Sequence, residues 1–426
     1  MFGLSGEWLL HDGVPVADAM VLSHPEQLDR LRASCPPAAP TAVLAGDPCY
    51  DRILAARGER ERYRRALGVR AGQRLLVLNS TWNGDSLFGD AGEQDILPLL
   101  LPRLAELPQD EYRPAAVLHP NIGHGHGPGQ VRLWLDRARR AGLLLVDPLD
   151  GWRQALIAAD AVLGDFGSVS YYAAALGTPV LLGSASLAAL GADSPVAAFV
   201  RSAPRLDPHA PLAPQLDRLL AGHRPLPGPA ECTSSDPGKA APLLRSLCYG
   251  LAGLPEPDWP ALLDPLPLPP YQPVELTAPV RVFSRTTTDG EVELRRQAAG
   301  EPAGDWTGHL SVHEETLDPG VLALADLIWR SGPPYDPRLG HPATWAAEVL
   351  ARHPGCAMAA YLTGPDTAVV ATRHGLRTLT TGPGGLHPAA AASALLAAGP
   401  GLPARLTVRT GGQRHTVQLG GLAAPD

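Results

Sequence analysis

A short polar turn that begins at Asp165 holds the side chains best suited to chemistry. It follows an apolar run at residues 161–163 that predicts a buried strand, and it precedes an apolar segment at 169–176 that predicts a helix. Backbone N–H groups at the start of a helix attract anions; Ser168 is expected to cap this helix, while Gly167 lets a ligand come close. The pattern predicts a phosphate or nucleotide site, with Asp165 as one of two catalytic residues.

Two further polar turns follow predicted strands in the same half of the chain. Ser80 and Thr81 come directly after the apolar run at 74–79, and His119 ends the next apolar run. Because parallel strands end at a common edge of their sheet, these side chains and Ser170 are expected to meet there. Hydroxyl groups can donate to phosphate oxygens, and His119 is predicted as the second catalytic residue, a charged clamp or the acid for a leaving phosphate. The alternative is that the hydroxyls only cap helices and that the histidine only occupies a loop.

Two other motifs in this region invite assignments that the sequence does not support. His119, His124 and His126 are close enough for a metal site, but glycines flank the last two and no carboxylate or cysteine completes a ligand shell nearby. The segment Pro237-Gly238-Lys239-Ala240 lacks both the first glycine and the Ser or Thr of a phosphate-binding P-loop. We therefore expect neither a metal nor nucleoside triphosphate hydrolysis.

Composition limits the class of protein. The chain has 426 residues, of which 45% are hydrophobic, and a net charge of −8, so it offers no general basic surface for nucleic acid. Its five cysteines are scattered and odd in number, which favours a reducing cytoplasm over a disulfide framework. No apolar run reaches the roughly 18 residues that a membrane span needs, so any membrane contact is expected to be peripheral.

Alternating apolar runs predict an α/β fold from about residue 41 to residue 200. The predicted strands are residues 41–45, 74–79, 115–119, 143–146 and 161–163, and the predicted helices are residues 50–67, 94–107, 129–141 and 152–159. Strands separated by single helices form parallel sheets, and short, continuous apolar strands are typical of sheets covered on both faces. We therefore expect a Rossmann-like parallel sheet of at least five or six strands.

The rest of the chain differs in composition from this region. The expected parts are residues 1–40, a remnant of an amino-terminal domain with its crossover; 41–251, the Rossmann-like domain; 252–280, a proline-rich linker; and 281–426, a further domain. The last part has hairpin-like turns and expected helices at 318–330, 343–352 and 388–398. It is predicted to be a small α+β domain, and the sequence suggests no role for it.

Several motifs in the first half resemble those of one known family. They are Gly46-Asp47-Pro48 with Asp51, Arg64-Arg65-Ala66-Leu67-Gly68, Asn79-Ser80-Thr81-Trp82, His119-Pro120, and the run from Ala159 to Val169. In this order and spacing they resemble the nucleotide-binding half of the CDP-glycerol glycerophosphotransferases, which make teichoic-acid-type polymers and have a two-domain glycosyltransferase-B fold. The resemblance covers roughly residues 40–250.

The resemblance implies a donor site without metal or cofactor, whose substrate is a nucleotide-diphosphate donor. By the match to the family, His119, Asp165 and Ser168 would contact the donor, as would, more weakly, Ser80, Thr81 and the turn Thr233-Ser234-Ser235. The sugar-nucleotide 2-epimerases share the arrangement in which Gly167 and Ser168 open a helix.

Two departures from the family leave several functions open. Phe166-Gly167 replaces a hydroxyl or imidazole that is usual in the turn, and residues 1–40 resemble only the end of the family's amino-terminal domain, so a partner chain could supply the rest. The expected function is a glycerophosphotransferase- or glycosyltransferase-like protein that binds a nucleotide-activated donor. One alternative is a non-catalytic nucleotide-binding or scaffold protein, and another is a sugar-nucleotide 2-epimerase-like enzyme.

Overall fold

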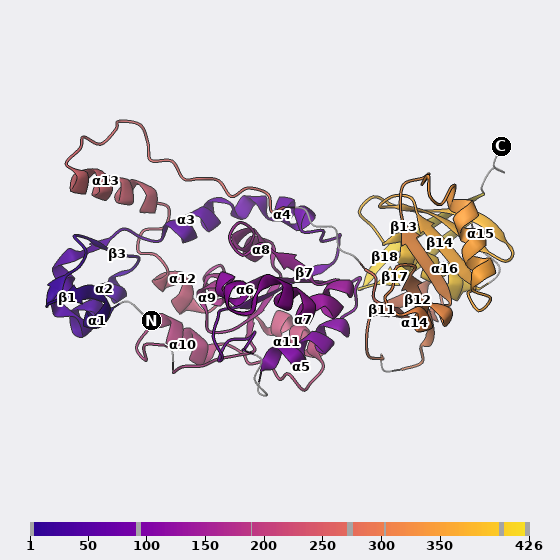
Figure 1. Ribbon diagram of the computed structural model, residues 1–426, viewed down its shortest axis with the longest axis horizontal. Coiled ribbons are helices and arrows are strands. Elements are labelled where there is room, and N and C mark those ends of the chain that lie inside the picture. The colour runs from indigo at the N-terminus through magenta and orange to yellow at the C-terminus, as the bar shows by residue number, and fades with distance from the viewer. Residues whose placement is uncertain are drawn as a thin grey trace.

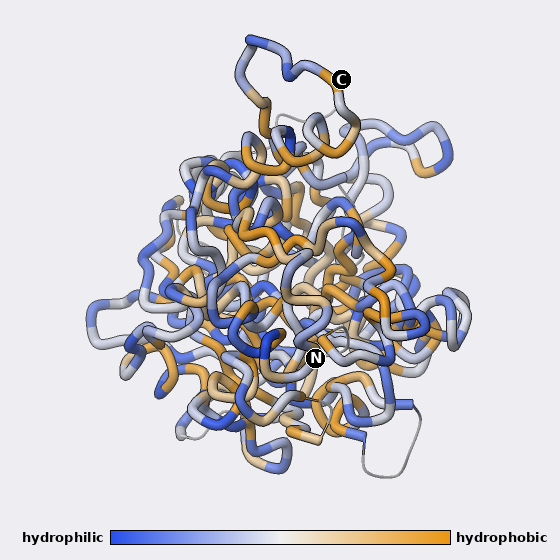
Figure 2. The backbone as a smooth tube through the Cα atoms, turned by 90° about the vertical axis from the view of Figure 1, so that its left-hand side faces the viewer, coloured by the Kyte–Doolittle hydropathy of each residue, from blue (hydrophilic) through white to orange (hydrophobic). Residues whose placement is uncertain are grey.

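The structure is a computed structural model that describes residues 4–90, 95–188, 190–270, 276–301, 304–399 and 404–421. It contains a five-stranded parallel sheet and a closed nine-stranded barrel. The barrel forms one end of the molecule, and the N-terminal elements form the other (Figure 1). Polar and apolar stretches alternate along the coloured part of the backbone, as expected where helices and strands bury only part of their surface (Figure 2).

The parallel sheet confirms the predicted Rossmann-like architecture. Its order is β7-β6-β5-β8-β9, and all neighbouring strands are parallel. The strands are β5 (Arg74–Ser80), β6 (Tyr112–Leu118), β7 (Leu144–Val146), β8 (Ala161–Gly164) and β9 (Val180–Leu182). Along β5, Leu75 and Val77 belong to one core cluster while Leu76 and Leu78 belong to another, so successive side chains enter cores on opposite faces.

Helices cover both faces of this sheet and explain why its strands are apolar throughout. One core contains residues of α4 (Arg60–Ala66), α8 (Trp152–Ala158), α9 (Ser168–Ala175) and α10 (Pro195–Ser202). The opposite core contains residues of α5 (Ile96–Ala105), α7 (Pro128–Arg140) and α11 (Leu212–Gly222). The remaining helices of this region are α3 (Pro48–Ala55), the 3-10 helix η2 (Arg57–Glu59), α6 (Pro120–His126), α12 (Pro227–Cys232) and α13 (Ala240–Ala252).

The first predicted strand is not part of the main sheet. β4 (Ala42–Leu44) pairs instead with β3 (Met20–Leu22) in a separate two-stranded parallel sheet, which leaves the main sheet with five strands. The other N-terminal elements are α1 (Gly6–Leu9), β1 (Leu10–His11), β2 (Val14–Pro15), α2 (Pro25–Ser34) and the 3-10 helix η1 (Pro36–Thr41). β3 and β4 lie beside a small core of their own around Leu31, which takes the apolar side chains that a sixth strand would have brought to the main sheet.

The proline-rich segment at 252–280 lies partly against the Rossmann-like region. The Tyr63 hydroxyl donates to the Leu266 carbonyl (3.1 Å), and the Gln154 amide donates to the Pro267 carbonyl (2.8 Å). Leu266 is buried in the same core as α4 and α8. Proline removes backbone donors, so the carbonyl groups of this segment serve as acceptors for side chains that face it.

The C-terminal region is a closed mixed barrel, so the prediction of a small α+β domain was wrong. Its order is β10-β11-β17-β18-β16-β15-β14-β13-β12. The strands are β10 (Val280–Thr286), β11 (Val292–Gln297), β12 (Thr307–His313), β13 (Leu327–Ser331), β14 (Met358–Leu362), β15 (Thr367–Thr372), β16 (Gly375–Thr381), β17 (Arg405–Thr410) and β18 (Gln413–Gly421). The helices are α14 (Pro319–Ala323), α15 (Pro342–Arg352) and α16 (Pro388–Ala398). The helix predicted at 318–330 ends after α14, because Leu327, Ile328 and Trp329 are buried in β13 between two parallel neighbours.

An alanine-rich helix occupies the interior of this barrel. α16 packs against strands around the barrel, among them β10, β11, β14 and β16, and residues 389–392 are fully buried. In β14, Met358 and Ala360 share the core of α16, whereas Ala359 and Tyr361 share another core with α15 outside the barrel. A helix buried on every side must be apolar all round, and alanine is small enough to let the surrounding strands close.

A buried ion pair joins the barrel to the sheet region. Arg296 of β11 donates through Nε and Nη2 to the carboxylate of Asp110, at 2.7 and 2.8 Å, and Arg70 donates to the same carboxylate at 3.0 Å. The Gln109 N–H donates to the Arg296 carbonyl at 2.8 Å. Burial alone would raise the pKa of Asp110, but the charges of Arg296 and Arg70 outweigh it and hold this pKa below its ordinary value.

Two chain-wide properties complete the description. All five cysteines are free thiols. Within the ranges that the structure describes, no helix is long and apolar enough to cross a membrane.

Candidate functional site

Three of the predicted turns meet at the carboxyl edge of the parallel sheet. β5 lies between β6 and β8, and the register pairs Ser80 with Leu118 and Leu78 with Leu163. The residues that follow the three strand ends therefore lie next to one another, which is the place where ligands of such sheets bind. His119 directly follows β6, Thr81 follows β5 and Asp165 follows β8.

Asp165 is the centre of this cluster and is fully buried. One carboxylate oxygen accepts from the Thr81 N–H (2.8 Å), the Leu87 N–H (3.0 Å) and the Ser80 hydroxyl (3.1 Å). The other accepts from the Gly167 N–H at 3.0 Å. Burial raises the pKa of Asp165 above its ordinary value, although these hydrogen bonds counteract part of the rise. The geometry suits a side chain that holds residues 80–88 in place.

The hydroxyl groups of this edge differ in access. Ser80 is buried, and its Oγ accepts from the Phe88 N–H (2.9 Å) besides donating within the cluster. Ser170 is fully buried and donates to the side-chain amide oxygen Oδ1 of Asn79 at 3.1 Å. Both buried hydroxyls therefore hold the turn through internal hydrogen bonds. Thr81, in contrast, is only half-buried.

The helix α9 begins one residue earlier than predicted. Its N-cap is Gly167, which has no side chain to cap the helix. The expectation that Ser168 caps the helix was therefore wrong, because Ser168 is the first helical residue, and it is exposed. A Cβ at Gly167 would lie 3.0 Å from the Asp165 carboxylate and 3.1 Å from Thr81, which favours glycine there. In the described part of the chain, the N–H groups of Ser168 and Val169 have no acceptor, so they are available to an anion.

His119 lies at the opposite side of the cluster, as the N-cap of α6. Its Nδ1 accepts from the Asn121 N–H at 3.1 Å, so the neutral ring carries its proton on Nε2. Burial lowers the pKa of His119, and the nearby Asp165 charge opposes that change. The ring packs against Trp82, with 6.3 Å between the ring centroids. His119 is thus a half-buried donor that is mostly neutral near pH 7.

The other histidines of this segment have separate environments. His124 is exposed on α6, whereas the ring of His126 packs against Phe88 and Trp134. Among the residues with described positions, no group of three histidine, cysteine or acidic side chains could hold a metal ion.

The predicted turn Thr233-Ser234-Ser235 lies against the N-terminal elements. Thr233 donates to the Pro229 carbonyl (2.6 Å), Ser234 Oγ accepts from the Asp47 N–H (3.2 Å), and the Ser235 N–H donates to the Ser23 carbonyl (2.8 Å). Where the structure is described, no hydrogen bond joins this turn to His119, Asp165 or Ser168. The structure therefore brings together the other predicted site residues, and this turn is not among them.

Trp82 and Asn79 belong to the cluster although they were not among the predicted site residues. Trp82 is 52% exposed at the mouth of the site, where a flat apolar surface can take a base or a sugar ring. Asn79 Nδ2 is buried without a hydrogen-bond partner among the described residues. Their position in Asn79-Ser80-Thr81-Trp82 was the available signal, because a tryptophan in a polar turn has no core to fill.

Some motifs of the family resemblance have structural roles at the other end of the sheet. Asp160 accepts from Arg60 and Arg64, each at 2.6 Å, and from the Leu75 N–H at 2.7 Å. These contacts tie α4 to the start of β5. The motif at residues 64–68 therefore supports the sheet and does not contribute to the carboxyl edge.

Comparisons with known proteins give similarities for part of the chain. No protein-family model and no curated protein sequence matches it. Solved structures similar to it include a variant of the wall teichoic acid polymerase TagF, with a TM-score of 0.41, 15% identity and coverage of 55% of this chain and 58% of that one. The UDP-GlcNAc 2-epimerase from Neisseria meningitidis, bound to UDP-GlcNAc, has a TM-score of 0.35, 14% identity and coverage of 55% and 61%.

A third structure is Anabaena Alr3699/HepE in complex with UDP and glucose. Its TM-score is 0.32 at 13% identity, with coverage of 56% of this chain and 64% of that one. The chain thus spans less than two thirds of the length of each of these three proteins.

Proposed function

We propose that the chain binds a nucleotide-activated donor at the carboxyl edge of its parallel sheet and acts as a glycerophosphotransferase- or glycosyltransferase-like protein. The observation that carries the proposal is the arrangement around Asp165: a buried carboxylate fixes the turn of β5 beside the open start of α9, with His119 opposite. The motif resemblance to CDP-glycerol glycerophosphotransferases supports the same donor class.

The donor's diphosphate would lie between α9 and His119. The free N–H groups of Ser168 and Val169, together with the exposed Ser168 hydroxyl, can donate to phosphate oxygens without a metal ion. Trp82 can stack on the base or the transferred group. In this arrangement Asp165 is a positioning residue, because its oxygens already accept four hydrogen bonds from protein donors.

His119 would bind and protonate the leaving phosphate. In the free protein, burial lowers the pKa of His119, so the ring is mostly neutral. A phosphate beside Nε2 stabilises the imidazolium and raises this pKa again, so donor binding takes up a proton. Affinity should therefore increase as the pH falls through the pKa of the bound state.

The non-catalytic alternative has one observation in its favour. Among the predicted site residues only His119 and Asp165 can titrate, and of these only His119 is accessible. Incubation of the protein with polyol acceptors and a donor of the preferred base distinguishes a transferase from a non-catalytic protein. Release of the nucleotide identifies a transferase, and binding without release identifies a nucleotide-binding protein.

Calorimetric titration of CDP, UDP, GDP and ADP tests the site. One base should bind preferentially, and His119→Ala should weaken its binding about 10- to 100-fold, the range for a lost hydrogen bond to a charged group. Ser168→Ala should weaken it less. The pH dependence of binding should disappear in His119→Ala.

His124→Ala is the matched control, because this exposed histidine lies on α6, the helix that His119 caps. It should bind like the unmodified protein. Unchanged affinity in folded His119→Ala and Ser168→Ala would show that the site is wrongly placed, and absence of binding by all four nucleotides would refute the donor proposal.

A further inference from the structure

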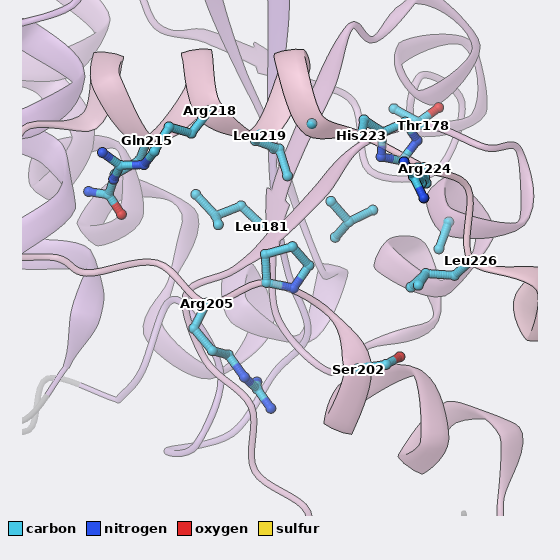
Figure 3. A pocket seen from close by; sticks show the side chains of 14 residues that line it. Thr178, Leu181, Ser202, Arg205, Gln215, Arg218, Leu219, His223, Arg224 and Leu226 are labelled. Atoms are coloured by element: carbon cyan, nitrogen blue, oxygen red, sulfur yellow. The ribbon is translucent and has the colours of Figure 1, made fainter.

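A cavity lies at the edge strand β9, away from the strand ends of β5, β6 and β8. It has a volume of about 420 Å³ and lies between α11, the segment after α10 and the segment that follows α11 (Figure 3). The chain at residues 204–206 extends the sheet beside β9, since the Leu182 N–H donates to the Pro204 carbonyl and the Leu206 N–H donates to the Leu182 carbonyl, each at 2.9 Å. β9 and the segment added beside it thus both contribute lining residues to the cavity.

Three arginines from different segments line this cavity. They are Arg205 beside β9, Arg218 on α11 and Arg224 just beyond that helix, and no acidic residue is among the lining side chains. Among the described residues, Arg218 and Arg224 have no ion-pair or hydrogen-bond partner. The guanidinium of Arg205 donates to the Val200 carbonyl, and burial lowers its pKa.

This charge distribution is unusual for the chain. Its net charge is −8, yet three positive side chains share one concave surface without a counter-ion. The three arginines lie at separate places around the cavity (Figure 3), and their summed positive potential attracts an anion to it. Guanidinium groups also match the planar, paired oxygens of carboxylates and phosphates.

The floor of the cavity is apolar. Val180 and Leu181 of β9, Leu219 of α11 and Leu226 line it, while Thr178 and Ser202 add hydroxyl groups at the rim. A pocket with apolar walls and a few polar groups, in the size range of about 300–1,000 Å³, is typical of small-molecule sites. The floor can take a carbon skeleton while the arginines take its charge.

We propose that this cavity binds a small organic anion, with its phosphate or carboxylate group on one of the two arginines at the ends of the cavity, Arg218 or Arg224 (Figure 3), and an apolar body against β9. The site is separate from the donor site, because its lining includes none of His119, Asp165 and Ser168. α9 connects the two places: its first residues lie at the carboxyl edge, and Ala174 near its end lines the cavity.

Titration with phenyl phosphate, benzoate and neutral benzyl alcohol tests the proposal. One or both anions should bind, the alcohol should not, and added salt should weaken binding. Arg218→Gln and Arg224→Gln should each weaken anion binding several-fold, and the double variant should weaken it at least tenfold. Which anion binds more tightly distinguishes a phosphate ligand from a carboxylate ligand.

Arg132→Gln is the matched control, because Arg132 is an exposed arginine of α7 that does not line the cavity. It should bind like the unmodified protein, and all variants should retain its circular dichroism spectrum. Binding of both anions that persists in the folded double variant, or absence of anion binding altogether, would overturn the proposal. Neither result would bear on nucleotide binding, which depends on His119.

Discussion

Two buried carboxylates in this molecule have opposite pKa shifts and different structural roles. Asp165 lies at the carboxyl edge of the sheet and accepts four hydrogen bonds from neutral donors, namely backbone N–H groups and one hydroxyl. Asp110 lies at the junction with the barrel and accepts from two arginines. The pKa of Asp165 is raised, mainly by burial, whereas the pKa of Asp110 is lowered because the arginine charges outweigh burial.

The difference shows how each carboxylate is suited to its place. Neutral donors can hold a carboxylate in a set geometry without adding charge, which keeps the site open to an anionic ligand. Guanidinium groups neutralise a carboxylate and make its removal costly, which suits a junction between two structures. The same side chain therefore organises a loop in one place and joins two regions in the other.

The largest expected effect comes from Asp110→Asn. It leaves Arg296 buried, with its bidentate partner replaced by a neutral amide that cannot accept from both guanidinium nitrogens. Removal of one partner of a buried pair costs about 3–5 kcal/mol of the free energy of unfolding. Urea unfolding followed by tryptophan fluorescence measures the loss.

Asp217→Asn provides the control for that substitution. Asp217 pairs with Arg74 at 3.0 Å, but its side chain is 63% exposed, so the loss should be below about 1 kcal/mol. The double variant Asp110→Asn/Arg296→Gln should be less destabilised than the sum of its single variants. Equal effects at Asp110 and Asp217 would contradict the role given to the junction.

The junction and the barrel were also the hardest parts to predict from the sequence. The parallel sheet was predictable because runs such as Leu75–Leu78 are too short and too apolar for surface helices. The barrel was not, since residues 327–329 look equally apolar as helix or strand, and only their pairing between β12 and β14 decides. Arg296 and Asp110 are 186 residues apart, and no local pattern joins them.

The sequence predicted where the candidate site lies, but not which of its residues hold the turn and which remain accessible. The polar turns after β5, β6 and β8 were recognisable because strand ends of a parallel sheet converge. The four donors to Asp165 were not, because the Leu87 N–H comes from a loop whose course the sequence does not fix. The helix starts one residue earlier than predicted, at Ser168, and its N-cap Gly167 belongs to the same contact network because the Gly167 N–H donates to Asp165.

A partly buried histidine of the barrel, His309, tests whether burial or charge decides such pKa values. His309 faces Asp326, which raises its pKa, and Arg296, which lowers it, but burial dominates and brings it to about 4. Its Nε2 has no hydrogen-bond partner within the described residues. Because the folded-state pKa is depressed, the unfolded state takes up the proton first, so acidification below about pH 6.5 favours unfolding.

The expected loss from this histidine is about 2 kcal/mol between pH 8 and pH 5. His309→Gln removes the titration and should flatten this part of the pH dependence, measured as thermal or urea unfolding at both values. His124→Gln, at an exposed position, should leave the pH dependence as it is. If the His309→Gln variant lost as much stability on acidification as the unmodified protein, charge and not burial would determine the pKa of His309.

Among the substitutions of buried side chains, the smallest expected change in stability comes from Asp165→Asn, the same substitution as at the junction. The amide oxygen can still accept from Thr81 and Leu87, while its NH₂ group faces the Gly167 N–H and leaves that one donor without an acceptor. We expect a loss of about 1–2 kcal/mol, smaller than at Asp110, because no buried cation loses its partner. Nucleotide affinity should nevertheless fall, since the start of α9 and the turn at Thr81 would no longer be held together. A loss as large as that of Asp110→Asn would mean that Asp165 balances a positive charge, and intact nucleotide affinity in the folded variant would mean that the turn keeps its shape without the carboxylate.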